Sequence, residues 1–238
     1  MIGDPGGEPW LDAPPPTAGQ APDGAALVDL ERWGRASHAG FFQRFTDPHF
    51  NVVAEVSLGP MLEVAAARGS SAFIAMLYAT TRAANELYAL RLRLREGVVV
   101  LHPRVHPSFT LRVDAEHFNY CGADYNDDYA TFEQGVRAAI DQKRGDRALR
   151  AEAEARDDLL FVSSLPWLRF TSIQHAAMDP RRDSFPRITW GRFTPTAAGT
   201  VAPLSLQGHH ALMDGIHTAM FFRRVEVLAA APDWLRPA

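Results

Sequence analysis

Alternation between apolar and polar residues along short stretches of this chain predicts β-strands. The residues of Val52–Ser57 alternate with a period of two, which is typical of a strand with one buried face. Apolar and β-branched residues also gather in several longer runs that are typical of strands. These runs lie at 98–101, 109–113, 159–163, 167–173, 187–193 and 201–206.

Other stretches have the spacing or the composition of helices. Pro60 suits the first position of a helix, and Gly69 suits its end. Ser70 and Ser71 are suited to cap the next helix, whose apolar residues recur at helical spacing. A charged, alanine-rich segment and the residues that follow Gly215 complete the set. We therefore expect helices over 60–69, 71–87, 131–155 and 216–227.

The order of these elements predicts the fold class. Strands and helices follow one another without regular βαβ alternation, so we expect an α/β fold, a two-layer sandwich with a large mixed β-sheet. The chain has 238 residues, of which 47% are hydrophobic, and this suits a single domain over residues 26–238. Residues 1–25 are rich in Pro, Gly and Ala, and we expect them to form a disordered or loosely attached arm.

Charge, cysteine content and the lengths of apolar runs indicate which partners and which cellular location to expect. The 24 basic and 28 acidic residues leave a net charge of −4, which argues against a nucleic-acid partner. A single cysteine, Cys121, rules out an internal disulfide and fits the reducing cytoplasm. No apolar run approaches the roughly 18–20 residues that span a membrane. The first 28 residues lack the features of a signal peptide, so a cytoplasmic location is expected.

The stretch Gln207–His217 (QGHHALMDGIH) holds most of the candidate chemistry, and it allows three interpretations. A strand-to-helix turn accounts for Asp214 and Gly215 but leaves the two adjacent histidines unexplained. A metal site is weakly supported, because His209 and His210 on a strand point to opposite faces. A histidine acting as general base near pH 7 is the third interpretation. Asp214 would then orient the ring or bind an arginine, and the spacing does not decide which.

Several segments together resemble the chloramphenicol acetyltransferase family. Two histidines, three residues, Asp-Gly and a further histidine form a stretch similar to its active-site signature. Ser163–Ser172 resembles its Ser-x-Leu-Pro-Trp segment, and Trp33-Gly34-Arg35 resembles its N-terminal Trp-x-Arg. His106–Thr110 resembles its Asp-Pro-x-Phe-Thr strand, and order and spacing match from about Asp29 to Leu228. The resemblance implies a large mixed sheet with helices on one side, assembled as a homotrimer with active sites at the subunit interfaces.

The resemblance also implies catalytic roles. His210 would remove the proton of an acceptor hydroxyl, which attacks the thioester of acetyl-CoA without a covalent acyl-enzyme. In the family pattern the base histidine's own backbone carbonyl fixes its tautomer. Ser163 would donate a hydrogen bond to the tetrahedral oxyanion, and Thr189 would support that oxyanion through water. Asp214 and Arg35 would pair and hold the turn.

The implied binding residues show where this chain departs from the family. Phe42 stands where drug-acetylating members have a tyrosine, and His175 stands where they have a leucine. An acceptor pocket is expected to be lined by Phe41, Phe42, Phe109 and His175. The CoA is expected to contact Ser163, Trp167 and Phe193.

We therefore expect an acyl-CoA-dependent O-acyltransferase with chloramphenicol as the default acceptor. Acetyl-CoA or another acyl-CoA is a co-substrate, and no bound cofactor and no metal are expected. One alternative keeps the fold but acylates a different hydroxyl or amine in natural-product biosynthesis, with an acyl carrier protein as a further donor. Another is a non-catalytic trimeric binding protein. The presence of His210, Ser163, Asp214 and Arg35 together argues against this last alternative.

Overall fold

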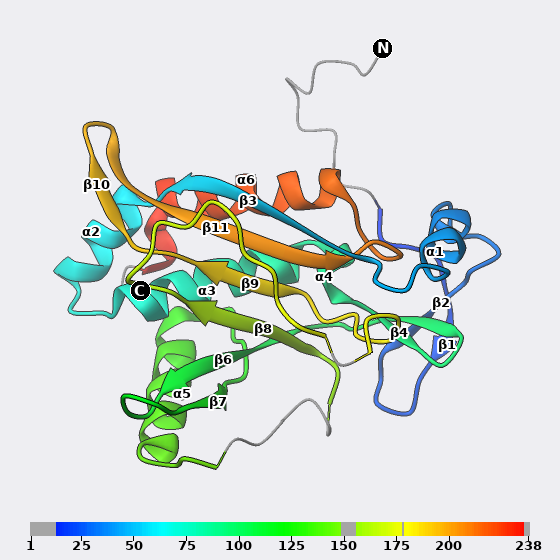
Figure 1. Ribbon diagram of the computed structural model, residues 1–238, viewed down its shortest axis with the longest axis horizontal. Helices are drawn as coiled ribbons and strands as arrows, with labels where there is room; N and C mark the ends of the chain where they lie inside the picture. The colour runs from blue at the N-terminus through cyan, green and yellow to red at the C-terminus, as the bar shows by residue number, and fades with distance from the viewer. Residues whose placement is uncertain (1–12, 149–155, 178, 236–238) are drawn as a thin grey trace.

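A seven-stranded mixed sheet organises the computed structural model, which describes residues 13–148, 156–177 and 179–235. The strands β10 and β9 pair with successive parts of one edge of β11, and β3 pairs with its opposite edge (Figure 1). The sheet continues beyond β9 in the order β8-β6-β7. The neighbours of β8 on both sides run parallel to it, whereas all other pairs are antiparallel. The bounds are β3 His49–Ser57, β6 His106–Arg112, β7 Phe118–Gly122, β8 Leu159–Ser164, β9 Arg187–Trp190, β10 Thr194–Thr196 and β11 Gly199–His209. The predicted large mixed sheet is confirmed.

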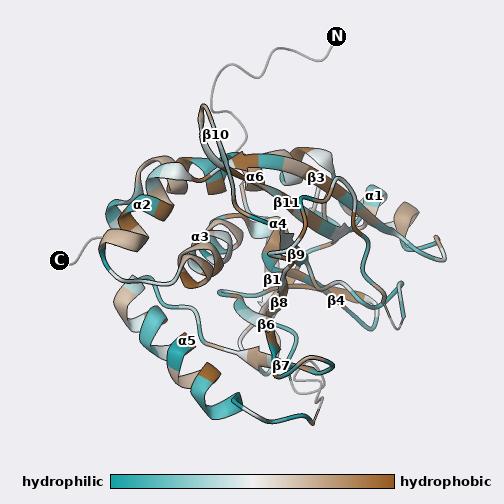
Figure 2. Cartoon of the chain, turned by 60° about the vertical axis from the view of Figure 1, so that its left-hand side comes forward, coloured by the Kyte–Doolittle hydropathy of each residue, from teal (hydrophilic) through white to brown (hydrophobic). Residues whose placement is uncertain are grey.

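Helices pack against this sheet and bury its apolar side. Figure 2 shows α2, α3 and α5 lying to one side of the large sheet. The most buried of them is α3, in which Ala75, Leu77 and Tyr78 are fully covered. The bounds are α1 Ala36–Phe42, α2 Gly59–Ala67, α3 Ala72–Glu86, α4 Tyr88–Arg91, α5 Tyr129–Lys143, α6 Gly215–Ala230 and the 3₁₀ helix Pro232–Leu235. In the part of the chain that the structure describes, every helix falls short of the length and apolar character needed to cross a bilayer.

A second, antiparallel sheet of four strands includes the N-terminal segment. Its order is β1-β2-β5-β4, with β1 Thr17–Gln20, β2 Ala26–Val28, β4 Leu92–Arg95 and β5 Val98–Leu101. The prediction that residues 1–25 form a loose arm is therefore wrong for β1, which pairs with β2. Ala25 is fully buried, and Asp23 forms an ion pair with Arg95 at 2.5 Å. Residues 1–12 lie outside the described part of the chain.

Two predicted strands differ from the structure. Residues 167–173 form a turn and an irregular loop, and the strand expected over 187–193 ends at Trp190. Hydrogen bonds hold this loop at both ends: before it Leu165 N donates to Trp190 O at 2.9 Å, and at its end Asn51 Nδ2 donates to Ile173 O. These bonds replace the ladder that a strand would form. The helix expected over 131–155 ends at Lys143, and residues 149–155 of that prediction lie outside the described chain.

Candidate active site

An arginine and an aspartate hold the turn between β11 and α6. Arg35 Nη1 donates to Asp214 Oδ2 at 2.5 Å, and Arg35 Nη2 donates to the carbonyl of His210 at 2.9 Å. Asp214 also caps α6, because its Oδ1 accepts from the backbone N–H of Ile216. Burial raises the pKa of Asp214, but the hydrogen bond and charge of Arg35 outweigh burial and leave it below its ordinary value. The predicted pair of Arg35 and Asp214 is confirmed.

The imidazole of His210 lies between two aromatic rings. The ring of Phe42 stacks on it with centroids 3.9 Å apart and planes 4° apart, and the ring of Phe50 lies at 4.7 Å. Nδ1 of His210 is buried and has no hydrogen-bond partner among the described residues. The expected bond from the ring to its own backbone carbonyl is therefore not found, and that carbonyl accepts from Arg35. Aromatic stacking orients the ring in its place.

Further aromatic rings extend this surface outward. Phe41 and Phe45 are 47% and 44% exposed, and their rings lie 5.1 Å and 5.5 Å from that of Phe42. We call the group of Arg35, Phe42, Phe50, His210 and Asp214 the base half-site. The sequence did not indicate Phe50, because its contact with His210 joins residues far apart in the chain. Phe45, which contacts its near neighbours Phe41 and Phe42, was not among the predicted residues either.

His209 faces away from this group and is a core residue. Its side chain is 2% exposed, and its ring lies 5.4 Å from that of His49. Nδ1 of His209 accepts from the backbone N–H of Ala211 at 3.2 Å. Burial, with a smaller contribution from His49, lowers the pKa of His209 to about 4. The expectation that His209 is structural agrees with this position.

A row of hydroxyl groups crosses four strands of the large sheet. Ser163 on β8 pairs with Thr189 on β9, and Thr189 pairs with Ser205 on β11. On the other side, Thr110 Oγ1 on β6 donates to Ser163 Oγ at 3.4 Å. Residues paired directly across strands point to the same face of a sheet. We call Thr110, Ser163, Thr189 and Ser205 the hydroxyl row.

His175 lies against the hydroxyl row. Its Nε2 is 2.9 Å from Thr189 Oγ1, and its backbone N–H donates to Gln207 Oε1 at 2.8 Å. Burial, together with the positive charge of Arg187, lowers the pKa of His175. Within one chain His175 lies against Thr189, whereas Phe42 stacks on His210, and their sharing of one acceptor pocket stays a prediction.

The base half-site lies at the end of β11, whereas the hydroxyl row crosses the middle of that strand. Thr189 pairs with Ser205, whereas His209 lies four residues further along β11, or about 13 Å at the usual rise per residue. The strands β8 and β9 run antiparallel to β11, so their ends point away from His210. In Figure 1 the end of β11 lies near α1, while the arrowhead of β8 points the other way. One chain therefore carries two separate halves of the predicted site.

The remaining predicted binding residues divide into two groups. Phe109 is 1% exposed and packs against Phe73 at 5.5 Å, so its ring is part of the core and not of an accessible pocket. Trp167 is 60% exposed in the turn after β8. Phe193 is partly buried in the segment after β9, which is tied to that turn because Arg192 N donates to Leu168 O at 2.7 Å. Trp167 and Phe193 thus lie at the same end of the sheet as Ser163.

A polar hollow of about 350 Å³ lies between β3 and the loop 171–174. Phe50 of the base half-site lines it together with the amide side chains Asn51, Gln174 and Gln207. Gln207 also binds the backbone of His175, so the hollow extends from one half of the site toward the other. These amides were not among the predicted residues, since single amide side chains carry no distinctive sequence signal.

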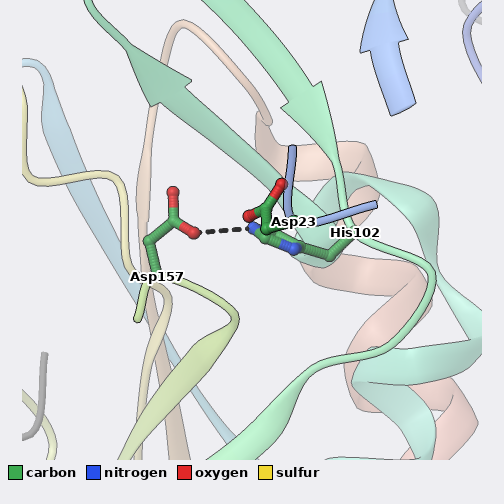
Figure 3. Close-up of side chains that lie close together, drawn as sticks. All are labelled: Asp23, His102 and Asp157. Atoms are coloured by element: carbon green, nitrogen blue, oxygen red, sulfur yellow. Dashed lines mark ion pairs between the residues drawn. The ribbon is translucent and has the colours of Figure 1, made fainter. Parts of the chain in front are cut away.

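One cluster of metal-ligand type lies apart from both halves. Asp23, His102 and Asp157 approach one another closely, and His102 Nε2 is 3.0 Å from Asp157 Oδ1 (Figure 3). Arg95 donates to both carboxylates, at 2.5 Å to Asp23 and at 2.6 Å to Asp157. Burial raises the pKa of Asp157, but Arg95 and His102 outweigh burial and lower it. The cluster is an ion-pair network that fastens the N-terminal segment to the sheet.

Comparison with known proteins agrees with this geometry. A sequence model of the family described as chloramphenicol acetyltransferase matches residues 25–226. The chloramphenicol acetyltransferase of Streptomyces acrimycini is 28% identical over 227 residues, which cover 94% of this chain and 100% of that protein. The enzyme of the same name from Proteus mirabilis is 25% identical over 204 residues, which cover 85% and 94%. A solved chloramphenicol acetyltransferase structure superposes with a TM-score of 0.80 and 30% identity, over 89% of this chain and 100% of that one.

Proposed function

Because this chain belongs to the chloramphenicol acetyltransferase family and is an acyltransferase, we propose that it transfers an acetyl group from acetyl-CoA to a hydroxyl group of chloramphenicol. The observation that carries this proposal is the fixed position of His210, whose carbonyl is bonded to Arg35 and whose ring is stacked on Phe42. General-base catalysis requires a histidine held in one orientation within reach of its substrate.

In the proposed reaction His210 takes the proton of the acceptor hydroxyl. Nδ1 is buried, so Nε2 is the nitrogen that an acceptor can reach. The acceptor oxygen forms a bond to the thioester carbon, and the carbonyl oxygen becomes an oxyanion. The C–S bond then breaks, and the CoA sulfur leaves with the proton that His210 carries. Neither a metal nor a covalent acyl-enzyme takes part in this sequence.

The proposed site for the oxyanion is the hydroxyl row. Ser163 would donate to the oxyanion, with Thr189 supporting it through water. One donor of this kind typically lowers the barrier by about 2.7–4 kcal/mol. Trp167 and Phe193, which lie at the same end of the sheet as Ser163, would contact the CoA.

A complete site then needs more than one chain. The row that contains Ser163 crosses β11 at Ser205, four residues before His209, so in the proposed assembly His210 of one copy meets Ser163 of another. A cyclic assembly with head-to-tail contacts brings two different surfaces together in this way. We infer a homotrimer whose three sites lie at its subunit interfaces, and the half-exposed rings of Phe41 and Phe45 support a covered surface next to His210.

The acceptor would lie against Phe42 of the base half-site and against Phe41 beside it. Phe41 and Phe42 offer flat apolar surface beside His210, which suits the aromatic ring of chloramphenicol. His175 would reach the same pocket from the neighbouring copy. The comparisons do not favour an acceptor from natural-product biosynthesis, and a carrier-protein donor and a cytoplasmic location stay predictions from the sequence.

The test is release of free CoA thiol from acetyl-CoA in the presence of chloramphenicol, with product identified by mass. We expect one acetylated chloramphenicol for each thiol released. Thiol release with other hydroxyl or amine acceptors, but not with chloramphenicol, would contradict the acceptor. No release with any acceptor or any acyl-CoA would contradict the activity itself.

A further inference from the structure

Three contacts fix His175 beside the hydroxyl row. Its backbone N–H donates to Gln207 Oε1 at 2.8 Å, and its carbonyl accepts from Gln207 Nε2 at 3.3 Å. The ring Nε2 lies 2.9 Å from Thr189 Oγ1. Gln207 is buried within β11, so this pair of hydrogen bonds to its side chain sets the direction in which the imidazole points.

The contact decides where the hydroxyl proton of Thr189 can go. A neutral imidazole has one nitrogen that donates and one that accepts. If Nε2 of His175 carries the proton, Thr189 accepts from it and keeps its own proton for another acceptor. If Nε2 carries no proton, the Thr189 hydroxyl donates its hydrogen bond to His175 and cannot donate to another group of the hydroxyl row. Thr189 is fully buried and pairs directly with Ser163, so this choice acts next to the serine.

The surroundings favour a neutral His175. Arg187 lies two residues before Thr189 on β9 and therefore on the same face of the sheet. Its guanidinium is paired with Asp183 at 2.5 Å, yet its positive charge and the burial of the ring both lower the pKa of His175. Gln207 and Asn51, whose side chains bind the backbone of the loop around His175, carry no charge. A neutral imidazole has one N–H proton, so the role of His175 depends on which ring nitrogen carries it.

We propose that His175 is a positioning residue of the reaction, whose Nε2–H donates to Thr189 and directs the threonine proton toward the oxyanion formed beside Ser163. The inference rests on the proposed function of the hydroxyl row. A hydroxyl that accepts one hydrogen bond is a better donor in the next, because the bonds polarise each other. Leucine at this position, as the family resemblance implies for drug-acetylating members, cannot make this bond.

The kinetic test compares His175→Leu with His175→Gln, because glutamine keeps an N–H donor at similar reach and leucine does not. We expect His175→Leu to lower kcat about tenfold with little change in KM, which is the effect of one hydrogen bond, and His175→Gln to restore most of it. Adding His175→Leu to Thr189→Val should lower kcat no further, since the two residues act as one unit. His117→Leu, at an exposed histidine paired with Asp114, is the matched control and should leave kcat unchanged.

The outcomes separate this inference from the proposed function. A wild type without thiol release contradicts the proposed function, whatever the variants do. An active wild type with an unchanged kcat in His175→Leu overturns the positioning role alone, as does a loss confined to the acceptor KM. Where a variant does not fold, ¹⁵N NMR of labelled histidine in the wild type decides. We expect the Nε2–H tautomer for His175 at neutral pH, and a dominant Nδ1–H tautomer would overturn the inference.

Discussion

The ring of Phe42 lies parallel to the imidazole of His210, with centroids 3.9 Å and planes 4° apart. This contact orients the His210 ring, because its Nδ1 has no hydrogen-bond partner among the described residues. We predict that Phe42→Ala lowers kcat between about ten- and a hundredfold, because a base displaced by about 1 Å loses alignment with its substrate. Phe42→Tyr keeps the ring and is the control. Equal kcat values for wild type and Phe42→Ala would contradict the role of the stack.

Replacement of His210 itself should remove catalysis without unfolding the protein. We predict that His210→Ala lowers kcat by about 10² to 10⁴, the usual contribution of a general base. The thermal midpoint should change little, because the partly exposed ring contributes only its stacking contacts to stability. A variant that retains more than a few per cent of wild-type turnover would show that another group is the base.

Loss of Arg35 should lower both stability and activity. Arg35→Ala leaves the carboxylate of Asp214 and the carbonyl of His210 without their donor. Asp214 is 31% exposed, so we expect a loss of about 1–3 kcal/mol in the free energy of unfolding, less than for a fully buried pair. Arg35→Lys should recover only part of it, since an ammonium does not reproduce the two-pronged contact.

The control for this prediction is Arg144→Ala. Arg144 and Asp141 form an ion pair in which both side chains are more than half exposed. Exposed pairs of this kind contribute about 0–1 kcal/mol. The free energy of unfolding of both variants is measured in denaturant. An equal loss in each would show that the Arg35–Asp214 pair stabilises the fold no more than an exposed pair does.

His209 should make the folded protein sensitive to acid. Its pKa is lowered to about 4 in the folded chain, whereas an unfolded histidine titrates near 6.5. Both states are neutral above pH 6.5, so the full stability is present there. As pH falls toward 4 the unfolded chain binds a proton that the folded chain does not, and roughly 3 kcal/mol is lost.

We predict that the free energy of unfolding of His209→Asn falls less steeply with decreasing pH than that of the wild type. Asparagine can accept from the backbone N–H of Ala211, as Nδ1 does now, and does not titrate in this range. The free energy of unfolding is measured in urea between pH 7.5 and 5. A wild type whose stability is constant over this range, or a variant that falls as steeply as wild type, would contradict the prediction.

The sequence predicted the parts of the site that depend on short motifs. The family resemblance implied one ion pair between Asp214 and Arg35 across 179 positions, and the structure forms it. Ser163 and Thr189 were assigned to one oxyanion function, and the sheet register places them side by side.

What the sequence did not predict depends on contacts between distant segments. Phe50 contacts His210 because β3 pairs along its own whole length with β11, as far as His209. The loop over 167–173 has the apolar, β-branched composition of a strand, yet its hydrogen bonds go to side chains and turns, which composition does not show. In the small sheet β1 pairs with β2, and Arg95 binds Asp23, 72 positions away, between these two strands; nothing local in the sequence indicates this contact.

The assignment of one active site to two chains has a direct measurement, co-expression of two variants that are each nearly inactive alone. His210→Ala lacks the base but keeps the hydroxyl row, and Ser163→Ala lacks the serine but keeps the base. If each site joins His210 of one copy to Ser163 of another, random mixing in a trimer leaves about a quarter of the sites intact. We predict thiol release at about a quarter of the wild-type rate. If both residues act within one chain, no mixed assembly holds an intact site, and release no faster than the sum of the two variants alone would contradict the shared site.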